Sequence, residues 1–393
     1  MCPSRLCLGK CKFGGNSPVK DEACGYDRRA FRIDKIIKFD RGRYMKKSVK
    51  TLAIGLCCGL VFGAVAGFSA CGKEDNLDAG KVYLKAMAGP QAVATMEADY
   101  FLLAEPAVTA QGKNGFAIKG DLQALYGGEN GYPQAVLVAK TELLTANPYW
   151  VEQFAFNVSQ AADWLTTASG ADVVSAVSSH VADKEYATTL KAPLLTADVM
   201  ARCGVWFSYA WEKPVQAEVK DFLSEMIAVN NKAAAMPADE FFWGGAPDYA
   251  LAETPPEEEI TVYMPDGAPA LALAKMMSVD TDEDGVTYKV VDPSLISSVL
   301  TYEDESKNAD MCVLPVTAAS KLLGKGDKYK MVGVVTHGNL FLISKTGEVL
   351  TAENMASLKG KTIGVLKINE VPGLTLKAVL NKYDIPFEEV KTV

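Results

Sequence analysis

Histidine is almost absent from this sequence of 393 residues, and cysteine is nearly confined to its first part. The two histidines are His180 and His337, and seven of the nine cysteines lie at or before Cys71. The other two, Cys203 and Cys312, belong to no CxxC pair. These counts argue against a multi-histidine metal site, a thiolate zinc site and a disulfide framework. We expect the protein to bind neither a metal ion nor a cofactor.

Positive charge is outnumbered by negative charge over most of the chain. Residues 1–70 carry 14 Lys and Arg against 5 Asp and Glu, whereas the rest has 26 basic and 43 acidic residues. The net charge of −8 therefore combines +9 at the front with −17 in the body. A body this acidic repels phosphates, so we expect no nucleic-acid partner. The composition, with 49% hydrophobic residues, is otherwise that of globular domains.

Motifs of nucleotide-binding enzymes and hydrolases are missing as well. Gly360-Lys361-Thr362 ends like a phosphate-binding loop, but Met355 stands where the first glycine of that loop belongs. The glycine-rich residues 127–131 lack the spacing of a dinucleotide-binding loop, and no serine stands in a nucleophile elbow. We therefore expect that the protein is not an enzyme.

Residues 45–70 have the features of a bacterial export signal. Three lysines follow Met45, and residues 51–70 contain no charged side chain. Small residues then precede Cys71, so the segment resembles the lipobox of bacterial lipoproteins, in which the cysteine is lipidated and becomes the mature N-terminus. A 20-residue transmembrane helix is the alternative. The lipobox predicts a protein anchored through Cys71 at the extracytoplasmic face of the cell membrane.

Residues 1–44 precede this export signal, which tolerates long extensions poorly. Four cysteines lie in this segment, but their spacing matches no standard set of zinc ligands. We predict that translation starts at Met45 and that 1–44 is an upstream leader, assigned to the protein from too early a start codon. Peptides from 1–44 found by mass spectrometry in the cell would contradict this.

A linker rich in glycine, proline and glutamate, residues 244–259, divides the body of the chain. The later segment alternates short β-branched runs with helical patterns, which predicts a parallel α/β sheet. The earlier segment is similar up to residue 140 and reads as helical from there to Trp243, with Trp206 and Trp211 as core residues of the helical part. Strands are predicted at residues 82–85, 100–104, 135–139, 260–264, 309–314, 331–335, 340–344, 362–366 and 387–393.

Three stretches resemble the extracytoplasmic substrate-binding proteins of ABC importers, in the branch that takes up sulfonates, taurine, nitrate and thiamine-precursor pyrimidines. Residues 359–365 are similar to the strand that enters the second lobe in that family. Residues 97–107, which contain Glu105-Pro106, resemble its acidic strand and loop. Asn147-Pro148 resembles the start of the helix after the chain returns to the first lobe.

The order of these stretches is exchanged relative to the family, where the part similar to 260–393 precedes the part similar to 76–243. The resemblance therefore implies a circularly permuted, two-lobed periplasmic-binding-protein-like fold of type II, α/β in class, with each lobe a mainly parallel sheet flanked by helices. A misassembled gene would give the same order. The predicted lobes comprise residues 79–140 with 355–393, and residues 141–243 with 260–354.

The resemblance places the ligand at turns that follow the strands, in the crevice between the lobes. Helix N-termini there present free N–H groups that suit anions, and glycine lets the backbone approach a ligand closely. For each residue the alternative is ordinary capping or packing at a strand–helix turn. The candidate ligand-binding residues are Glu105, Asp266, Gly267, Ala268, Thr317, His337, Asn339, Asn369, Gly373 and Thr375.

These expectations together describe a monomeric, lipid-anchored solute-binding protein. It would capture a small anionic or heterocyclic ligand and deliver it to an ABC permease and its ATPase. One alternative is an enzyme on the same fold, similar to a pyrimidine-precursor synthase, whose cysteine-rich iron motif has no counterpart in the body of this chain. A sensor lipoprotein that transports nothing is the other alternative.

Overall fold

The computed structural model describes residues 78–128, 130–247, 256–279 and 285–390. All of them belong to the second of two compact units, Lys73–Val393, into which the chain divides. The predicted leader 1–44, the predicted signal peptide 45–70 and the predicted lipidation site Cys71 lie outside the described residues. Half of the predicted linker, residues 248–255, lies outside them too.

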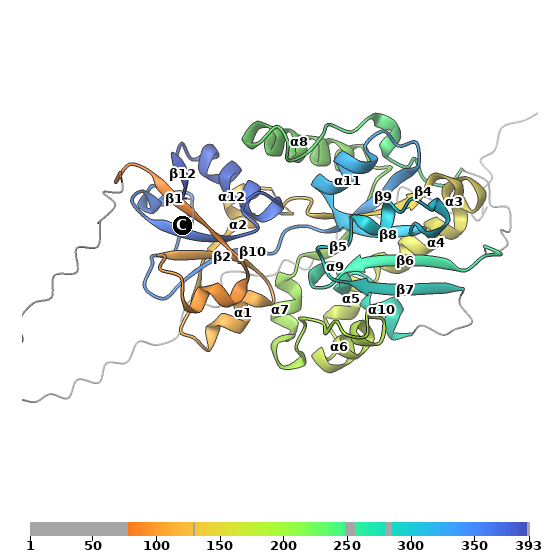
Figure 1. The fold of residues 1–393 in the computed structure, drawn as a ribbon, viewed down its shortest axis with the longest axis horizontal. Coiled ribbons are helices and arrows are strands. Elements are labelled where there is room, and N and C mark those ends of the chain that lie inside the picture. Colours follow the sequence, from red (N-terminus) through yellow and green to blue (C-terminus); the bar gives the residue numbers. More distant parts are fainter. Residues whose placement is uncertain (1–77, 129, 248–255, 280–284, 391–393) are drawn as a thin grey trace, which may run out of the picture. The chain divides into compact units, whose positions relative to one another are not determined.

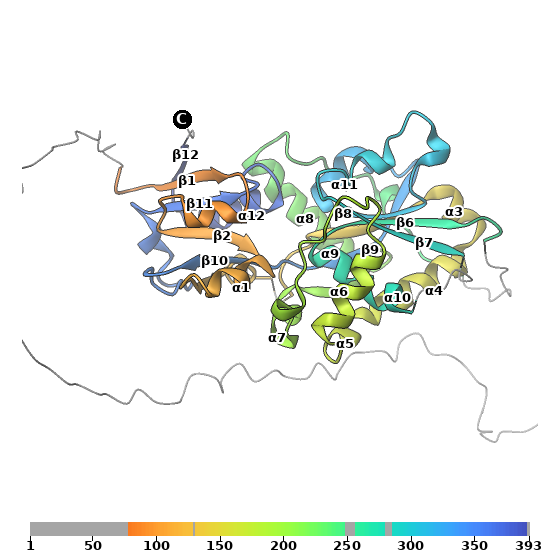
Figure 2. The same cartoon turned by 60° about the horizontal axis from the view of Figure 1, so that its bottom comes forward.

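The first sheet has six strands and joins segments that are far apart in the sequence. Tyr83 pairs with Thr362 and Val82 pairs with Phe387, so β1 lies between β11 and β12 and is parallel to both. Figure 1 and Figure 2 show these orange and dark-blue strands side by side. In spatial order the strands are β12 (Phe387–Val390), β1 (Val82–Met87), β11 (Thr362–Leu366), β2 (Tyr100–Ala104), β10 (Leu340–Ser344) and β3 (Ala117–Asp121).

The second sheet also has six strands, and its strand directions are mixed. β6 is parallel to β7 and β8, whereas β4 is antiparallel to both of its neighbours and β5 is antiparallel to β9. The prediction of mainly parallel strands is therefore wrong for this sheet, while the α/β class is confirmed. In spatial order the strands are β5 (Val205–Tyr209), β9 (Tyr329–Thr336), β4 (Ala135–Lys140), β8 (Met311–Pro315), β6 (Ile260–Pro265) and β7 (Val286–Val291).

Sheet membership differs from the predicted lobe boundaries by one strand on each side. β4 belongs to the second sheet, although residues 79–140 were expected in the other lobe, and β10 belongs to the first sheet, although it falls within 260–354. The chain passes between the sheets earlier than predicted, at glycines with positive φ: Gly131 (84°) and Gly338 (78°). Apolar periodicity identifies a strand but does not indicate which sheet it joins.

Helices cover both sheets, and the part predicted as helical after residue 140 begins with three short helices. Residues from Leu143 to Leu165 form α3, α4 and α5, because Pro148 begins a new helix at a position that suits its missing N–H. The α-helices are α1 (Ala107–Gly112), α2 (Leu122–Tyr126), α3 (Thr141–Ala146), α4 (Pro148–Ser159), α5 (Ala161–Leu165), α6 (Gly170–Ser179), α7 (Ala197–Arg202), α8 (Lys213–Val229), α9 (Ala268–Leu271), α10 (Ala274–Ser278), α11 (Val316–Leu323) and α12 (Val371–Lys382). Short 3₁₀ helices span Pro90–Ala94, Ala192–Leu194, Asp239–Phe241, Ser298–Leu300, Glu305–Lys307 and Met355–Leu358.

One apolar core cluster includes side chains from both sheets and from α8. Leu84 and Leu102 of the first sheet belong to the same cluster as Val136 and Leu314 of the second. Phe222 of α8 belongs to it as well and stacks in parallel on another ring of the cluster. Burial of this shared apolar surface holds the described residues together.

Candidate functional site

Two segments that pass between the sheets lie against each other and bring several polar side chains together. The backbone N–H of Gln134 donates to the carbonyl of Thr336 (2.9 Å), and that of His337 donates to the carbonyl of Gly204 (2.8 Å). A Cβ atom on Gly131 would stand 2.3 Å from the His337 carbonyl oxygen. Only glycine permits this approach of one backbone to the other.

His337 is buried at this point and is held by two residues of β5. Its ring stacks on Trp206 with centroids 4.1 Å apart and planes 9° apart, and its Nε2 lies 3.0 Å from Ser208 Oγ. Burial lowers the pKa of His337 to about 3. The imidazole is therefore neutral near pH 7, with one nitrogen that donates and one that accepts.

Buried polar atoms without a hydrogen-bond partner are concentrated here. Six side-chain atoms of this kind occur among the described residues, and four of them are Gln134 Oε1, Thr336 Oγ1, His337 Nδ1 and Asn339 Oδ1. The Asn339 amide nitrogen lies 3.5 Å from the Glu105 carbonyl, which leaves Oδ1 as an acceptor. Leaving such a group unpaired costs about 1–3 kcal/mol, so a cluster of four points to a partner from outside the chain.

An ion pair adjoins these atoms and joins the end of β2 to α7. Glu105, at the end of β2, accepts from Arg202 Nε (2.8 Å) and lies 2.7 Å from its Nη2, while Nη2 also donates to Thr109 Oγ1 (3.1 Å). The Glu105 side chain is fully buried and that of Arg202 is 34% exposed. The Glu105 N–H donates to the Asn339 carbonyl (3.0 Å), which ties the ion pair to the His337 segment.

We call this group of residues the crossing cluster. Of the candidate residues from the sequence, Glu105, His337 and Asn339 belong to it. The remaining members were not predicted, although two signals pointed to them: Arg202 is the only arginine after residue 43, and Trp206 and Ser208 alternate along β5. The members are Glu105, Thr109, Gln134, Arg202, Trp206, Ser208, Thr336, His337 and Asn339.

The placement of Trp206 in a helical stretch is wrong. Residues Val205–Tyr209 form β5. A second apolar cluster packs on the second sheet, and Val205, Phe207 and Tyr209 contribute to it. Trp206 and Ser208 are not part of this cluster. A strand directs alternate side chains to opposite faces, so Trp206 and Ser208 face His337 instead. Trp206 is half-buried, which leaves part of its ring accessible.

Asp266 follows β6, and its carboxylate already has hydrogen-bond partners within the chain. Its buried carboxylate accepts hydrogen bonds from the Tyr186 hydroxyl (3.0 Å), the Thr188 hydroxyl (2.6 Å) and both the N–H and hydroxyl of Thr189 (2.6 and 2.7 Å). Four donors saturate a carboxylate, so Asp266 holds the loop that precedes α7. The following Gly267 has a φ of 104° and precedes α9, whose first residue, Ala268, is buried.

The other four candidates are positioned by ordinary helix chemistry. Thr375 donates to the Val371 carbonyl (2.7 Å) inside α12, and the Thr317 carbonyl accepts from Ser320 (2.9 Å) inside α11. A Cβ on Gly373 would lie 2.1 Å from the Ile368 carbonyl oxygen, so this glycine allows α12 to start. Asn369 is exposed, with Oδ1 3.5 Å from a lysine ammonium. Among described residues, no hydrogen bond joins these four to the crossing cluster.

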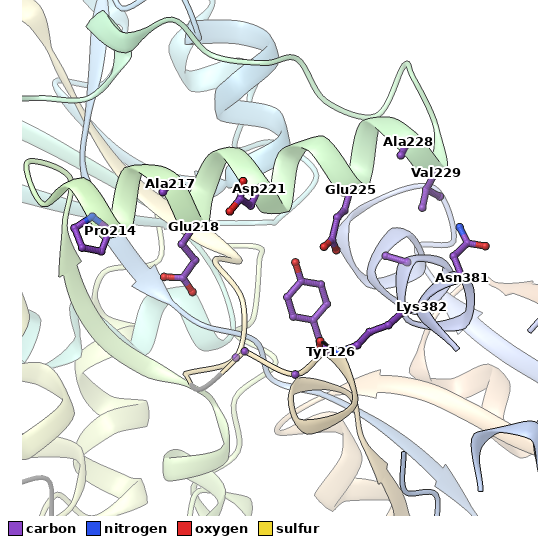
Figure 3. Close-up of a pocket in the computed structure, with 14 residues that line it drawn as sticks. Tyr126, Pro214, Ala217, Glu218, Asp221, Glu225, Ala228, Val229, Asn381 and Lys382 are labelled. Carbon is purple, nitrogen blue, oxygen red and sulfur yellow. Dashed lines mark hydrogen bonds between the residues drawn. The ribbon is translucent and has the colours of Figure 1, made fainter. Parts of the chain in front are cut away.

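Two cavities are lined by other described residues and include none of the candidates. One, of about 870 Å³, lies between α8, α12 and the loop after α2 (Figure 3). The other, of about 730 Å³, surrounds the C-terminal end of α11. Neither cavity coincides with the crossing cluster, which we identify from its unpaired polar atoms instead.

The chemistry available at the crossing cluster favours binding. Ser208 and His337 have the spacing of a nucleophile and its base. However, a histidine whose pKa is about 3 is a weak base, and no carboxylate of the described residues accepts from its Nδ1. The thiols of Cys203 and Cys312 are buried, and burial raises the pKa of Cys203 to about 12, so neither is reactive.

The described part of the chain contains no group of three His, Cys, Asp or Glu side chains arranged to hold a metal ion. Within the same residues, no helix has the length and apolar character needed to span a bilayer. Comparisons with protein-family models, with curated proteins and with solved structures found no match to this chain.

Proposed function

We propose that this protein is a solute-binding protein that holds a small, flat heterocyclic ligand at the crossing cluster. The observation that carries the proposal is the concentration of four unpaired, buried polar atoms beside the stacked rings of Trp206, which is half-buried, and His337, which is buried. A site with a few fixed polar groups and an aromatic wall is typical of small-molecule recognition. The two segments that connect the sheets pass through this cluster, as a hinge beside a ligand would require.

The polar groups favour a ligand that carries N–H donors over an oxyanion. Gln134 Oε1 and Asn339 Oδ1 are carbonyl oxygens and can only accept. His337 is neutral, and Arg202, the one cation in the cluster, already pairs with Glu105. The exposed part of the Trp206 ring offers a stacking surface for a planar ring. An amino- or amide-bearing heterocycle therefore satisfies the cluster better than a sulfonate or nitrate does.

The fold supports a finer assignment, which is part of the proposal. Two α/β sheets joined by adjacent connecting segments fit a two-lobed binding protein of type II. The interleaving of β1 with β11 and β12 fits an exchanged order of segments, that is, a circular permutation. We further propose that a lipid on Cys71 anchors the monomer outside the cytoplasmic membrane, where it serves an ABC permease and ATPase. Mass spectrometry of the wild type and Cys71→Ala tests the anchor, because the variant should be neither lipidated nor cleaved before residue 71.

A hydrolase is the second candidate, and the 3.0 Å contact between Ser208 and His337 is the observation in its favour. The two functions differ in what happens to a bound ester or amide. A binding protein returns it unchanged, whereas a hydrolase releases an acid product that chromatography detects. Loss of such product in Ser208→Ala would establish the hydrolase and refute the binding protein.

A thermal-shift screen with calorimetry tests the proposed ligand class. Aminopyrimidines and purines should raise the melting temperature of the wild type, whereas sulfonates, nitrate and short carboxylates should not. Trp206→Ala should weaken binding of the heterocycle by about tenfold to a hundredfold, because one stacking contact is lost. Trp164→Ala is the matched control, since Trp164 packs against the second sheet's core. Anions that stabilise the wild type and Trp206→Ala equally would contradict the proposal.

A further inference from the structure

The cavity beside α8 is a groove with its own chemistry, and we call it the α8 groove. It has a volume of about 870 Å³ and is separate from the crossing cluster. Figure 3 shows α8 along one wall, with Tyr126 and Lys382 on the opposite wall. Its lining residues on α8 are Pro214, Ala217, Glu218, Asp221, Glu225, Ala228 and Val229.

α8 has two different faces, and the groove is lined by the more exposed of the two. The inward face buries Val219, Phe222 and Met226 in the shared core. The groove face presents three acidic side chains, Glu218, Asp221 and Glu225, with alanines at both ends. From Pro214 to Val229 this face is about 22 Å long at 1.5 Å per residue.

The three carboxylates of the groove repel one another, and described residues do not neutralise them. Glu218 and Asp221 are three residues apart and Asp221 and Glu225 four, which places like charges side by side on the helix and destabilises it. No ion pair among the described residues includes any of the three. The nearby cations are engaged: Lys220 pairs with Asp239, and the Lys382 ammonium donates to the Tyr126 carbonyl.

Burial within the groove adds to this cost. It raises the pKa of Glu218, and no cation offsets that effect. It also raises the pKa of Tyr126, to which the charge of Glu225 and a hydrogen bond with its carboxylate contribute next. Glu218 and Glu225 extend from α8 toward Tyr126, the last residue of α2 (Figure 3). A cation placed between these walls would relieve both the repulsion and the desolvation.

We propose that the α8 groove docks a segment of a partner protein that carries lysine or arginine side chains among small apolar residues. Charge complementarity identifies the cations, because the three carboxylates that line the groove form no ion pair among the described residues. Ala217 and Ala228, two small residues of the α8 wall, leave room for the backbone of such a segment. The groove extends along four turns of α8, which suits a chain segment better than a single small amine.

This docking surface is distinct from the ligand site, so its test does not depend on the proposed function. The probe is a short fluorescent peptide with lysine at every fourth position among alanines, and a second peptide with glutamate in place of lysine. Anisotropy titrations with the full chain should show binding of the lysine peptide alone, weaker as salt rises. The triple variant Glu218→Gln, Asp221→Asn, Glu225→Gln should weaken this binding by about tenfold to a hundredfold.

A matched control removes three exposed acidic charges elsewhere, at Glu185, Glu303 and Glu348, each changed to glutamine. It should bind the peptide within about twofold of the wild type, because salt screens distant charges. Melting followed by circular dichroism should show the groove variant at least as stable as the wild type, since repulsion on α8 is relieved.

Three results would overturn the proposal. Equally weakened binding of the lysine peptide by the groove variant and by the control variant would mean that the peptide is attracted to the acidic protein as a whole. Spermidine binding without peptide binding would reduce the groove to a polyamine site. Self-association lost in the groove variant would assign the groove to a second copy of this chain.

Discussion

Replacement of Arg202 by methionine should destabilise the protein, because it leaves a buried carboxylate without its cation. The change removes the contacts of Nε and Nη2 with Glu105 Oε1 (2.8 and 2.7 Å) and of Nη2 with Thr109 Oγ1 (3.1 Å). Glu105 then remains as a fully buried carboxylate that keeps only the N–H and hydroxyl of Thr109 as donors.

The magnitude follows from how far each partner is buried. Breaking a fully buried ion pair by removing one partner costs about 3–5 kcal/mol, and because Arg202 is 34% exposed we expect about 2–3 kcal/mol. Arg202→Lys should cost less than Arg202→Met but should not restore wild-type stability, since an ammonium is a point charge and cannot span Glu105 and Thr109 as a planar guanidinium does. Glu105→Gln added to Arg202→Met should recover part of the loss, because no uncompensated charge then stays buried.

Urea unfolding followed by fluorescence measures these effects as a double-mutant cycle on Glu105 and Arg202. A coupling free energy of at least about 1 kcal/mol is expected for residues in direct contact. Lys328→Met is the control, because the Lys328–Glu305 pair is exposed on both sides, and its unfolding midpoint should stay close to that of the wild type. Additive effects of the two changes within about 0.5 kcal/mol would refute the reasoning.

Two more predictions concern residues singled out in the sequence. The pKa of His337 is about 3 in the folded protein, below its ordinary value of 6.5. As the pH falls, the unfolded chain therefore binds this proton before the folded chain does. The free energy of unfolding should then decrease by up to about 1.4 kcal/mol for each pH unit from pH 6.5 down to pH 3. Urea unfolding at several pH values should show this pH dependence of stability in the wild type and in His180→Gln, and a weaker one in His337→Gln. Equal pH dependence in all three proteins would contradict the prediction. Gly373→Val should prevent correct folding, because the new Cβ would meet the Ile368 backbone. Gly267→Ala has open space around the new Cβ and should cost only about 1–2 kcal/mol of stability, because of its positive φ. A Gly373→Val protein with a normal melting temperature would refute the packing argument.

Strands with continuous apolar runs could be recognised from the sequence, but their partners could not. The predicted strand at 362–366 coincides with β11, and that at 340–344 coincides with β10. Yet β10 joins β2 and β3, which lie more than two hundred residues earlier. Pairing of this kind is fixed by burial of the assembled sheet, and no local pattern encodes it.

Only part of the candidate site could be predicted, because contacts between side chains of distant segments are not encoded locally either. Glu105, His337 and Asn339 were found because they follow strands at expected turns. Arg202 ends a six-residue helix and carries no motif, so only its position beside Glu105 reveals its role. Asp266 followed a strand just as Glu105 did, but three neighbouring side chains and a backbone N–H satisfy it. Whether a polar residue is free to bind depends on neighbours distant in sequence.

The interleaving of strands makes the linker 244–259 a poor boundary between domains. The segment before it supplies β1, β2 and β3 to the first sheet and β4 and β5 to the second. The segment after it supplies β6 to β9 to the second sheet and β10 to β12 to the first. Either segment alone would leave both sheets incomplete, with unpaired backbone groups and apolar faces exposed to water. The two halves therefore fold as one unit, and the crossing cluster exists only in the assembled chain, since Glu105, Arg202 and Trp206 come from one half and His337 and Asn339 from the other.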